Sequence, residues 1–198
     1  MEAIQIPIVY NQYGDYDPNG LLYVLEQDSK RIQKEALLRF QQSPPQPYEE
    51  VQPLVLRVNL GDTVKICFRN WLRRRLSIHV QGLGYDVMTS DGTSTGINQD
   101  STTNGEIEYT WYAKTEGMFL FPDMADSRSG EESANIHGLF GAIIVEPSGA
   151  KWYENFAKRG IPMGSRRSLR RREQKHVGNM YCSFKMESTY ACIQGICR

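Results

Sequence analysis

The sequence lacks any hydrophobic run near the roughly 18 residues that a transmembrane helix needs, which argues against a membrane-spanning helix. Its first twenty residues lack the basic region, the long apolar stretch and the small-residue cleavage site of a secretory signal. We also find no glycine-rich phosphate loop, metal-protease signature or Ser/His/Asp order. We therefore expect a soluble protein, and the sequence does not indicate its compartment.

Charge is divided unevenly along the chain, although the formal net charge is zero. Residues 1–155 hold 13 basic and 21 acidic side chains (net −8), whereas residues 156–198 hold 10 and 2 (net +8). Five arginines fall between residues 166 and 172. Because blocks of like charge repel one another and rarely pack, we predict a folded domain over 1–155 and a disordered, basic, cysteine-containing tail over 156–198.

Short alternating segments indicate β-strands. Val64, Ile66 and Phe68 alternate with polar residues, as in a sheet with one face on the core and the other in water. The predicted strands are 4–8, which Pro7 would place at a sheet edge, and 54–59, 63–70, 76–81, 106–112, 118–121 and 142–146. Many short strands separated by turns predict an all-β sandwich with Greek-key connections.

One helix interrupts this pattern. Ile32 and Ala36 lie four residues apart in an amphipathic segment, which predicts a helix over about 29–42. Asp28 or Ser29 would cap it by accepting hydrogen bonds from its first free amides. A helix before the main run of strands is an insertion into the sandwich.

Three segments are predicted to be loops. Residues 11–20 are dense in Asn, Asp, Gly and Pro, which favour turns. The loops over 82–105 and 122–137 exceed the length of about 12–15 residues beyond which a loop usually carries function or disorder. A functional site is therefore expected in these two long loops.

The most informative stretch is 54–82, LVLRVNLGDTVKICFRNWLRRRLSIHVQG. It resembles the amino-terminal domain of multicopper oxidases, in which a G-D-x-V-x-I-x-x-x-N-x-L phrase precedes S-I-H-x-H-G. The resemblance continues through Asp91-Gly92 and the closing strand up to Pro147, and it covers about residues 50–150. The positions that match the opening phrase are Gly61, Asp62, Val64, Ile66, Asn70, Leu72, Ser77, Ile78, His79 and Gly82.

This resemblance implies a cupredoxin-like sandwich or barrel and a set of copper-ligand positions. In the family, four histidines would occupy positions 79, 81, 122 and 124. Here those residues are His79, Gln81, Pro122 and Met124. Imidazole binds copper far more readily than an amide, and a thioether suits mainly Cu(I). His79, with Gln81 and Met124, is therefore the candidate copper site, and the alternative is that His79 is only a hydrogen-bonded histidine in a strand.

His137 is a further candidate ligand, because the long loop before it could fold back over His79. In the family this position borders the last strand and is not a ligand. A structural role for His137 is therefore the favoured interpretation, and a copper-binding role would need several imidazoles to converge on one metal ion.

A mononuclear blue copper site needs a cysteine and histidines with a weak axial methionine. Cys67 has no histidine within ten residues, and none lies between Cys182 and Met186. We therefore predict that the chain has no blue site, and so no internal route for electrons from a substrate to dioxygen. In the absence of a secretory signal, the four cysteines are interpreted as thiols, with a disulfide framework as the alternative.

The phrases around residues 78–82 and 85–92 look closest to bacterial oxidases linked to manganese oxidation. Carboxylates in the second long loop have the ligand chemistry that Mn²⁺ prefers, although such residues more often solvate a loop. These loop residues are Asp123, Asp126, Glu131 and Glu132.

The tail allows three other interpretations. Its cysteines and His176 have zinc-ligand chemistry, but the close cysteine pairs of structural zinc sites are absent. The run 166–175 could neutralise phosphates, but without an aromatic platform no specific nucleic-acid binding is expected. The abrupt change in composition would also follow from an out-of-frame extension.

The resemblance implies a copper-dependent oxidoreductase that couples oxidation of a metal or a phenol to reduction of dioxygen. We expect this chain to be the amino-terminal cupredoxin module of such an enzyme, truncated and inactive alone, and to act with further cupredoxin domains of the same or another chain. The alternative is a non-catalytic β-sandwich that serves as a structural or interaction module.

Overall fold

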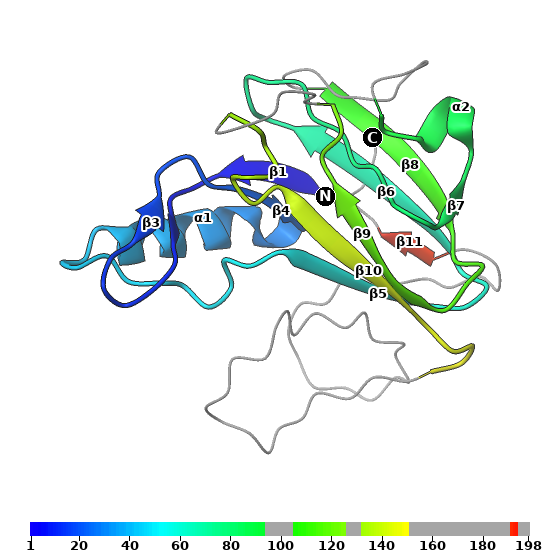
Figure 1. Ribbon diagram of the computed structural model, residues 1–198, viewed down its shortest axis with the longest axis horizontal. Helices are drawn as coiled ribbons and strands as arrows, with labels where there is room; N and C mark the ends of the chain where they lie inside the picture. Colours follow the sequence, from blue (N-terminus) through cyan, green and yellow to red (C-terminus); the bar gives the residue numbers. More distant parts are fainter. Residues whose placement is uncertain (94–104, 126–131, 151–190, 194–198) are drawn as a thin grey trace.

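The computed structural model describes residues 1–93, 105–125, 132–150 and 191–193 (Figure 1). Eleven strands and two helices occur in this part of the chain. In chain order they are β1 (Glu2–Gln5), β2 (Ile8–Val9), β3 (Tyr16–Asp17), β4 (Leu21–Val24), α1 (Glu26–Phe40), β5 (Leu54–Asn59), β6 (Thr63–Asn70), β7 (Gly84–Tyr85), α2 (Val87–Ser90), β8 (Gly105–Tyr112), β9 (Gly117–Pro122), β10 (Phe140–Glu146) and β11 (Ala191–Ile193).

Two sheets form the body of the protein. The larger has the order β4-β1-β6-β8-β7, with β11 also paired to β6, and the smaller has the order β5-β10-β9. Strand β10 runs parallel to β5 and antiparallel to β9. The predicted all-β, cupredoxin-like sandwich with one inserted helix is confirmed.

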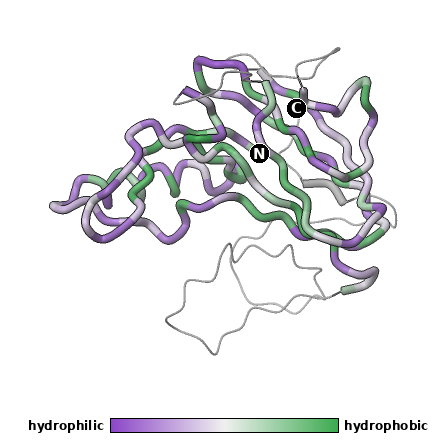
Figure 2. Tube along the Cα trace, viewed as in Figure 1, coloured by the Kyte–Doolittle hydropathy of each residue, from purple (hydrophilic) through white to green (hydrophobic). Residues whose placement is uncertain are grey.

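The core lies between the two sheets because alternate residues of each strand face inward. In β6 the inward residues are Val64, Ile66 and Phe68, and none is exposed to solvent. Trp111 from β8 packs against Phe121 from β9, with ring centroids 5.7 Å apart. Figure 2 shows the hydrophobic residues gathered along these central strands.

Helix α1 covers one end of the larger sheet and forms a second, smaller core. Its buried residues Ile32 and Ala36 join apolar side chains of β1 and β4, including Ile4 and Leu22. Because α1 covers one face of β4 and the sandwich core covers the other, all four residues of β4 are buried. The helix places an amphipathic layer on a strand that the main core alone would leave half exposed.

The predicted helix exists, but its predicted start and cap are wrong. The helix begins at Glu26 and ends at Phe40, and Leu25 occupies the N-cap position without a side-chain hydrogen bond. The carboxylate of Asp28 instead accepts a hydrogen bond from Arg31, at 2.9 Å. Ser29 is buried inside the first turn. Both residues that the sequence offered as caps thus lie inside the first turn of the helix, with partners one turn further along.

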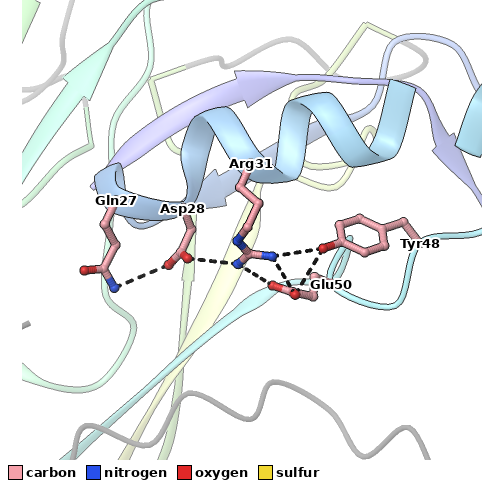
Figure 3. Close-up of polar contacts among 5 residues, drawn as sticks. All are labelled: Gln27, Asp28, Arg31, Tyr48 and Glu50. Atoms are coloured by element: carbon pink, nitrogen blue, oxygen red, sulfur yellow. Dashed lines mark hydrogen bonds and ion pairs between the residues drawn. The ribbon is translucent and has the colours of Figure 1, made fainter. Parts of the chain in front are cut away.

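Arg31 ties α1 to the link that precedes β5 (Figure 3). Its guanidinium donates to both carboxylate oxygens of Glu50, at 2.7 and 2.8 Å, and to the hydroxyl of Tyr48 at 2.9 Å. Hydrogen bonds with Glu50 and Asp28 raise the pKa of Arg31. A bidentate pair of this kind fixes orientation as well as distance, so it sets where the chain enters β5.

Two further predictions near the amino terminus need correction. The strand predicted over 4–8 ends at Gln5, and it lies between β4 and β6 instead of at a sheet edge. Pro7 falls between β1 and β2, where no sheet hydrogen bond is lost. The segment 11–20, predicted to be a loop, includes the short strand β3 at Tyr16–Asp17.

Strand β11 is the part of the predicted tail that the structure describes, and it pairs parallel to β6. The rest of the tail, which includes the arginine cluster, His176, Cys182 and Cys197, lies outside the described residues. Cys67 forms no disulfide with another described residue. Among the described helices, neither is long and apolar enough to cross a membrane.

Candidate metal centre

Residues 77–81 bring the first candidate ligand beside β9. The amide of His79 donates to the carbonyl of Pro122 at 3.1 Å, and the amide of Gln81 donates to the carbonyl of Leu120 at 2.8 Å. The segment is extended, but apart from the bridge residue Leu76 it is not part of a regular strand, so the strand predicted over 76–81 is largely wrong. These two bonds nevertheless hold it along the edge of the smaller sheet.

Alternation along this segment sets the direction of each side chain. Ile78 and Val80 are fully buried in the core. His79 is partly buried and Gln81 is exposed, which places both on the opposite side of the segment. Two of the four candidate copper positions therefore share one face of the protein.

Gly92 fixes the backbone that faces His79. Its φ is +74°, and a Cβ at this position would lie 2.2 Å from the carbonyl oxygen of Ile78. Only glycine fits such a close approach at positive φ. The carbonyl of Gly92 also accepts a hydrogen bond from the Ser77 hydroxyl at 2.5 Å. The Asp91-Gly92 turn is therefore locked against the segment that holds His79.

The imidazole of His79 is oriented by this turn. Its Nδ1 lies 2.6 Å from the carbonyl oxygen of Asp91. Because a carbonyl only accepts, Nδ1 carries the proton and the lone pair of the neutral ring is on Nε2. The ring also makes an edge contact with Tyr85, with centroids 5.8 Å apart. A ligand histidine whose other ring nitrogen is held by a carbonyl is the usual arrangement at protein metal sites.

The carboxylate of Asp91 lies beside the same ring, with Oδ1 3.5 Å from Nδ1 of His79. Burial alone would raise the pKa of Asp91, but hydrogen bonds from Thr93 and Tyr85 lower it overall. The hydrogen bond to Asp91 raises the pKa of Tyr85 to about 12. These groups form a closed network around the ring, in which Asp91 is ionised and Tyr85 is a neutral donor.

Asp123 supports the site from inside the protein. It is fully buried, and its carboxylate accepts a hydrogen bond from the amide of Ser77 at 2.8 Å. Its backbone is held by the side chain of Asn135, which bonds to the Asp123 amide and carbonyl at 3.0 and 2.7 Å. Asp123 thus joins the start of the His79 segment to the end of β9.

The remaining candidate positions supply no imidazole near His79. Pro122 has no donor atom in its side chain, and Met124 is 40% exposed. His137 pairs with a different residue: its Nδ1 lies 2.7 Å from a carboxylate oxygen of Asp17 in β3. Within the described ranges, no group of three or more His, Cys, Asp or Glu side chains gathers as a metal site.

The acidic residues considered for Mn²⁺ do not form a group in the part of the chain that is described. Asp123 uses its carboxylate on Ser77, and Glu132 lies at the exposed surface. Asp126 and Glu131 lie outside the described residues.

Sequence reasoning missed the residues that position His79. Asp91 acts through its backbone carbonyl, and Asp123 acts from the core, so neither role has a sequence signature of its own. The Asp91-Gly92 dipeptide was the available signal, because a glycine that must adopt positive φ marks a tight turn. No sequence pattern predicted that Asp17 would be the partner of His137.

The arrangement of two sheets with the candidate ligands along one edge defines a cupredoxin-like domain. A crystal structure of a multicopper oxidase from Pseudomonas thermotolerans superposes with a TM-score of 0.51 at 18% identity, over 78% of this chain and 31% of that one. At this identity the match shows the fold alone.

The sequence profile of the multicopper oxidases matches residues 50–150, so the chain belongs to the multicopper oxidase family. It is 35% identical over 97 residues to a probable nitrite reductase-hydroxylamine oxidoreductase fusion protein of Kuenenia stuttgartiensis, over 48% of this chain and 11% of that protein. It is 33% identical over 93 residues to multicopper oxidase elcG of Phaeosphaeria nodorum, over 46% of this chain and 14% of that protein. The chain thus spans a small fraction of the curated relatives that it matches.

Copper is the cofactor that family membership implies. The residues present fit one ligand, because the hydrogen bond at Nδ1 of His79 leaves the lone pair on Nε2 for a metal ion. They do not fit a copper cluster: Gln81, Pro122 and Met124 offer an amide, no donor and a thioether in place of imidazole. The described residues therefore do not complete a copper site by themselves.

Proposed function

We propose that this chain is a cupredoxin module of a multicopper oxidase that contributes a single imidazole, His79, to a copper site completed by another domain. The hydrogen bond from Nδ1 of His79 to the Asp91 carbonyl carries this proposal, since it directs the lone pair of Nε2 away from the turn. The candidate positions at 79 and 81 share one face beside the end of β9. Further cupredoxin domains, on the same or another chain, would supply the missing ligands.

The proposed division of the chain is a cupredoxin domain over 1–155 and a separate basic tail over 156–198. Within the family, we place this domain at the amino-terminal position of a bacterial enzyme. The opening G-D-x-V-x-I phrase and the S-I-H sequence support this position. The phrases around His79 and Asp91 support an enzyme of the manganese-oxidising type.

A second candidate function is a structural or interaction module that binds no metal. One observation favours it: the outer face of β9 and β10 is apolar. Met118 and Leu120 are 69% and 49% exposed, and Phe140 on β10 is exposed on the same face. A further cupredoxin domain is the partner that we assign to this face, because the relatives are much longer than this chain.

Copper titration with electron paramagnetic resonance separates the two candidates. The purified wild-type chain is expected to bind Cu(II) weakly, and His79→Ala is expected to abolish the signal from that site, because no other described imidazole lies with it. His137→Ala is the matched control and should leave the signal unchanged, since His137 pairs with Asp17. A chain that binds no copper, or loses it equally in both variants, would favour the structural module.

The isolated chain is expected to oxidise neither Mn(II) nor a phenol when loaded with copper. The physical reason is that three of the four family ligand positions lack histidine. Oxygen consumption measured with each substrate, with and without added Cu(II), tests this. Turnover that depends on copper and disappears in His79→Ala would contradict the expectation and would show a complete site.

A further inference from the structure

One edge of strand β6 is fully paired with a single strand, and the other edge is divided between two shorter strands. Strand β8 covers the first edge along its whole length, from Thr63 opposite Tyr112 to Asn70 opposite Gly105. On the second edge β1 pairs only with Arg69 and Asn70. The second edge is therefore open over the first half of β6 unless another strand fills it.

Strand β11 fills that open half. It runs parallel to β6, with Ala191 opposite Val64, Cys192 opposite Lys65 and Ile193 opposite Ile66 (Figure 1). An unpaired edge presents backbone donors and acceptors that readily accept an added strand. Pairing by β11 satisfies these groups without any contribution from the smaller sheet.

The side chains along the open half of β6 would also select which peptide strand binds there. Val64 and Ile66 are completely buried, so a strand in this register has its first and third residues beside core positions. Lys65 points to the outer face, where it pairs with Glu108 at 3.2 Å. In strand addition, backbone hydrogen bonds supply affinity and alternate side chains supply specificity. The edge therefore suits an extended peptide with apolar residues two apart.

The connection between the body and β11 is long. Strand β10 ends at Glu146 and β11 begins at Ala191, so residues 147–190 separate them. A connection of 44 residues is long enough, when extended, to span more than the diameter of a domain. Because Ala191–Ile193 and β6 belong to one chain, their pairing is intramolecular, and a free peptide has to compete with it.

We propose that the open half of β6, over Thr63–Ile66, is a binding site for an extended apolar peptide strand, and that the chain occupies this site with its own residues Ala191–Ile193. The interaction is separable from the body, because β1 and β8 hold β6 in the sheet without any contribution from β11. This site lies in the larger sheet, and the proposal does not depend on copper at His79.

The test measures binding of a fluorescein-labelled peptide of residues 187–196, with serine in place of Cys192, to the full chain by fluorescence anisotropy. The variant Ala191→Pro/Cys192→Pro removes two successive backbone N–H groups, one of which must face β6. We expect this variant to bind the peptide at least about 10-fold more tightly than wild type, because the tethered strand no longer competes. The matched control, Ile196→Pro/Cys197→Pro, should bind like wild type. Equal binding to all three proteins, or binding to none, would overturn the proposal.

A cross-linking experiment tests the register in a chain with β11 intact. Lys65→Cys is introduced with Cys67, Cys182 and Cys197 replaced by serine, which leaves Cys192 as its partner. Mild oxidation should give a disulfide within one chain, because the two residues are directly opposite. Thr110→Cys, opposite Lys65 on the far side of β6, should form none, since it lies one strand further away than a disulfide can span. No cross-link with Lys65→Cys, or equal cross-linking by both, would contradict the proposed site.

Discussion

Replacing Gly92 with alanine is expected to lower the free energy of unfolding by about 2–5 kcal/mol, through a strained backbone and a steric clash. The backbone at Gly92 has a φ of +74°, and an added Cβ would lie 2.2 Å from the carbonyl oxygen of Ile78. Backbone atoms cannot rotate away as a flexible side chain can. The turn would have to separate from the segment that carries His79, so urea denaturation should show the loss and copper binding should weaken with it.

Gly149→Ala is the matched control for this prediction. Gly149 has a similar φ of +77°, but nothing lies within 4 Å of an added Cβ. Its substitution should therefore cost only the backbone strain, about 1–2 kcal/mol. The difference between the two variants isolates the clash with Ile78. If both variants lost the same stability, the close approach of Gly92 to Ile78 would not be a constraint on the fold.

Replacing Asp123 with alanine is expected to cost about 2–3 kcal/mol of stability, because it leaves the buried amide of Ser77 without its charged acceptor. The side chain is fully buried, so water cannot easily take its place. The same substitution should loosen the junction between the His79 segment and β9. Urea denaturation gives the stability, and hydrogen exchange at the amides of Ser77 and His79 reports the local effect.

Asp123→Asn separates the hydrogen bond from the loss of side-chain volume. The amide oxygen of asparagine can still accept the hydrogen bond from Ser77, so this variant should keep at least half of the stability lost in Asp123→Ala. Two equally destabilised variants would mean that the negative charge matters more than the hydrogen bond. Two variants as stable as wild type would show that the Ser77 amide finds another partner.

Strong alternation allowed the sequence to predict the central strands closely. The predicted strands 54–59 and 63–70 coincide with β5 and β6, because each has one face in the core and the other in water. Strand β4 was missed for the opposite reason. Its four residues, Leu21–Val24, are all apolar and all buried between helix α1 and the main core, so they show no alternation.

The helix was predicted from its apolar face, but its start depends on contacts that are distant in sequence. Asp28 is a good cap by residue type, yet its carboxylate bonds with Arg31, which in turn binds Glu50. The energy of one cap is about 1 kcal/mol, so such a network can override it. Local preference therefore located the helix and misplaced its first turn by three residues.

The candidate site was predictable in part. The strand predicted over 76–81 contains His79 and Gln81 two residues apart, and in the structure both lie away from the core. It could not show that the Asp91 carbonyl would orient the His79 ring, because that contact joins residues twelve positions apart. Nor could it show that Asp123 would be buried beneath Ser77. Both depend on how two loops pack against each other, and no local pattern encodes that packing.

The parallel pairing of β5 and β10 has a consequence for where the chain enters and leaves the smaller sheet. Leu54 lies opposite Gly141 and Asn59 opposite Glu146, so the first and last strands of the family-matched region are neighbours that point the same way. A strand of six residues is about 20 Å long. The chain consequently enters the family-matched region and leaves it at opposite ends of the smaller sheet.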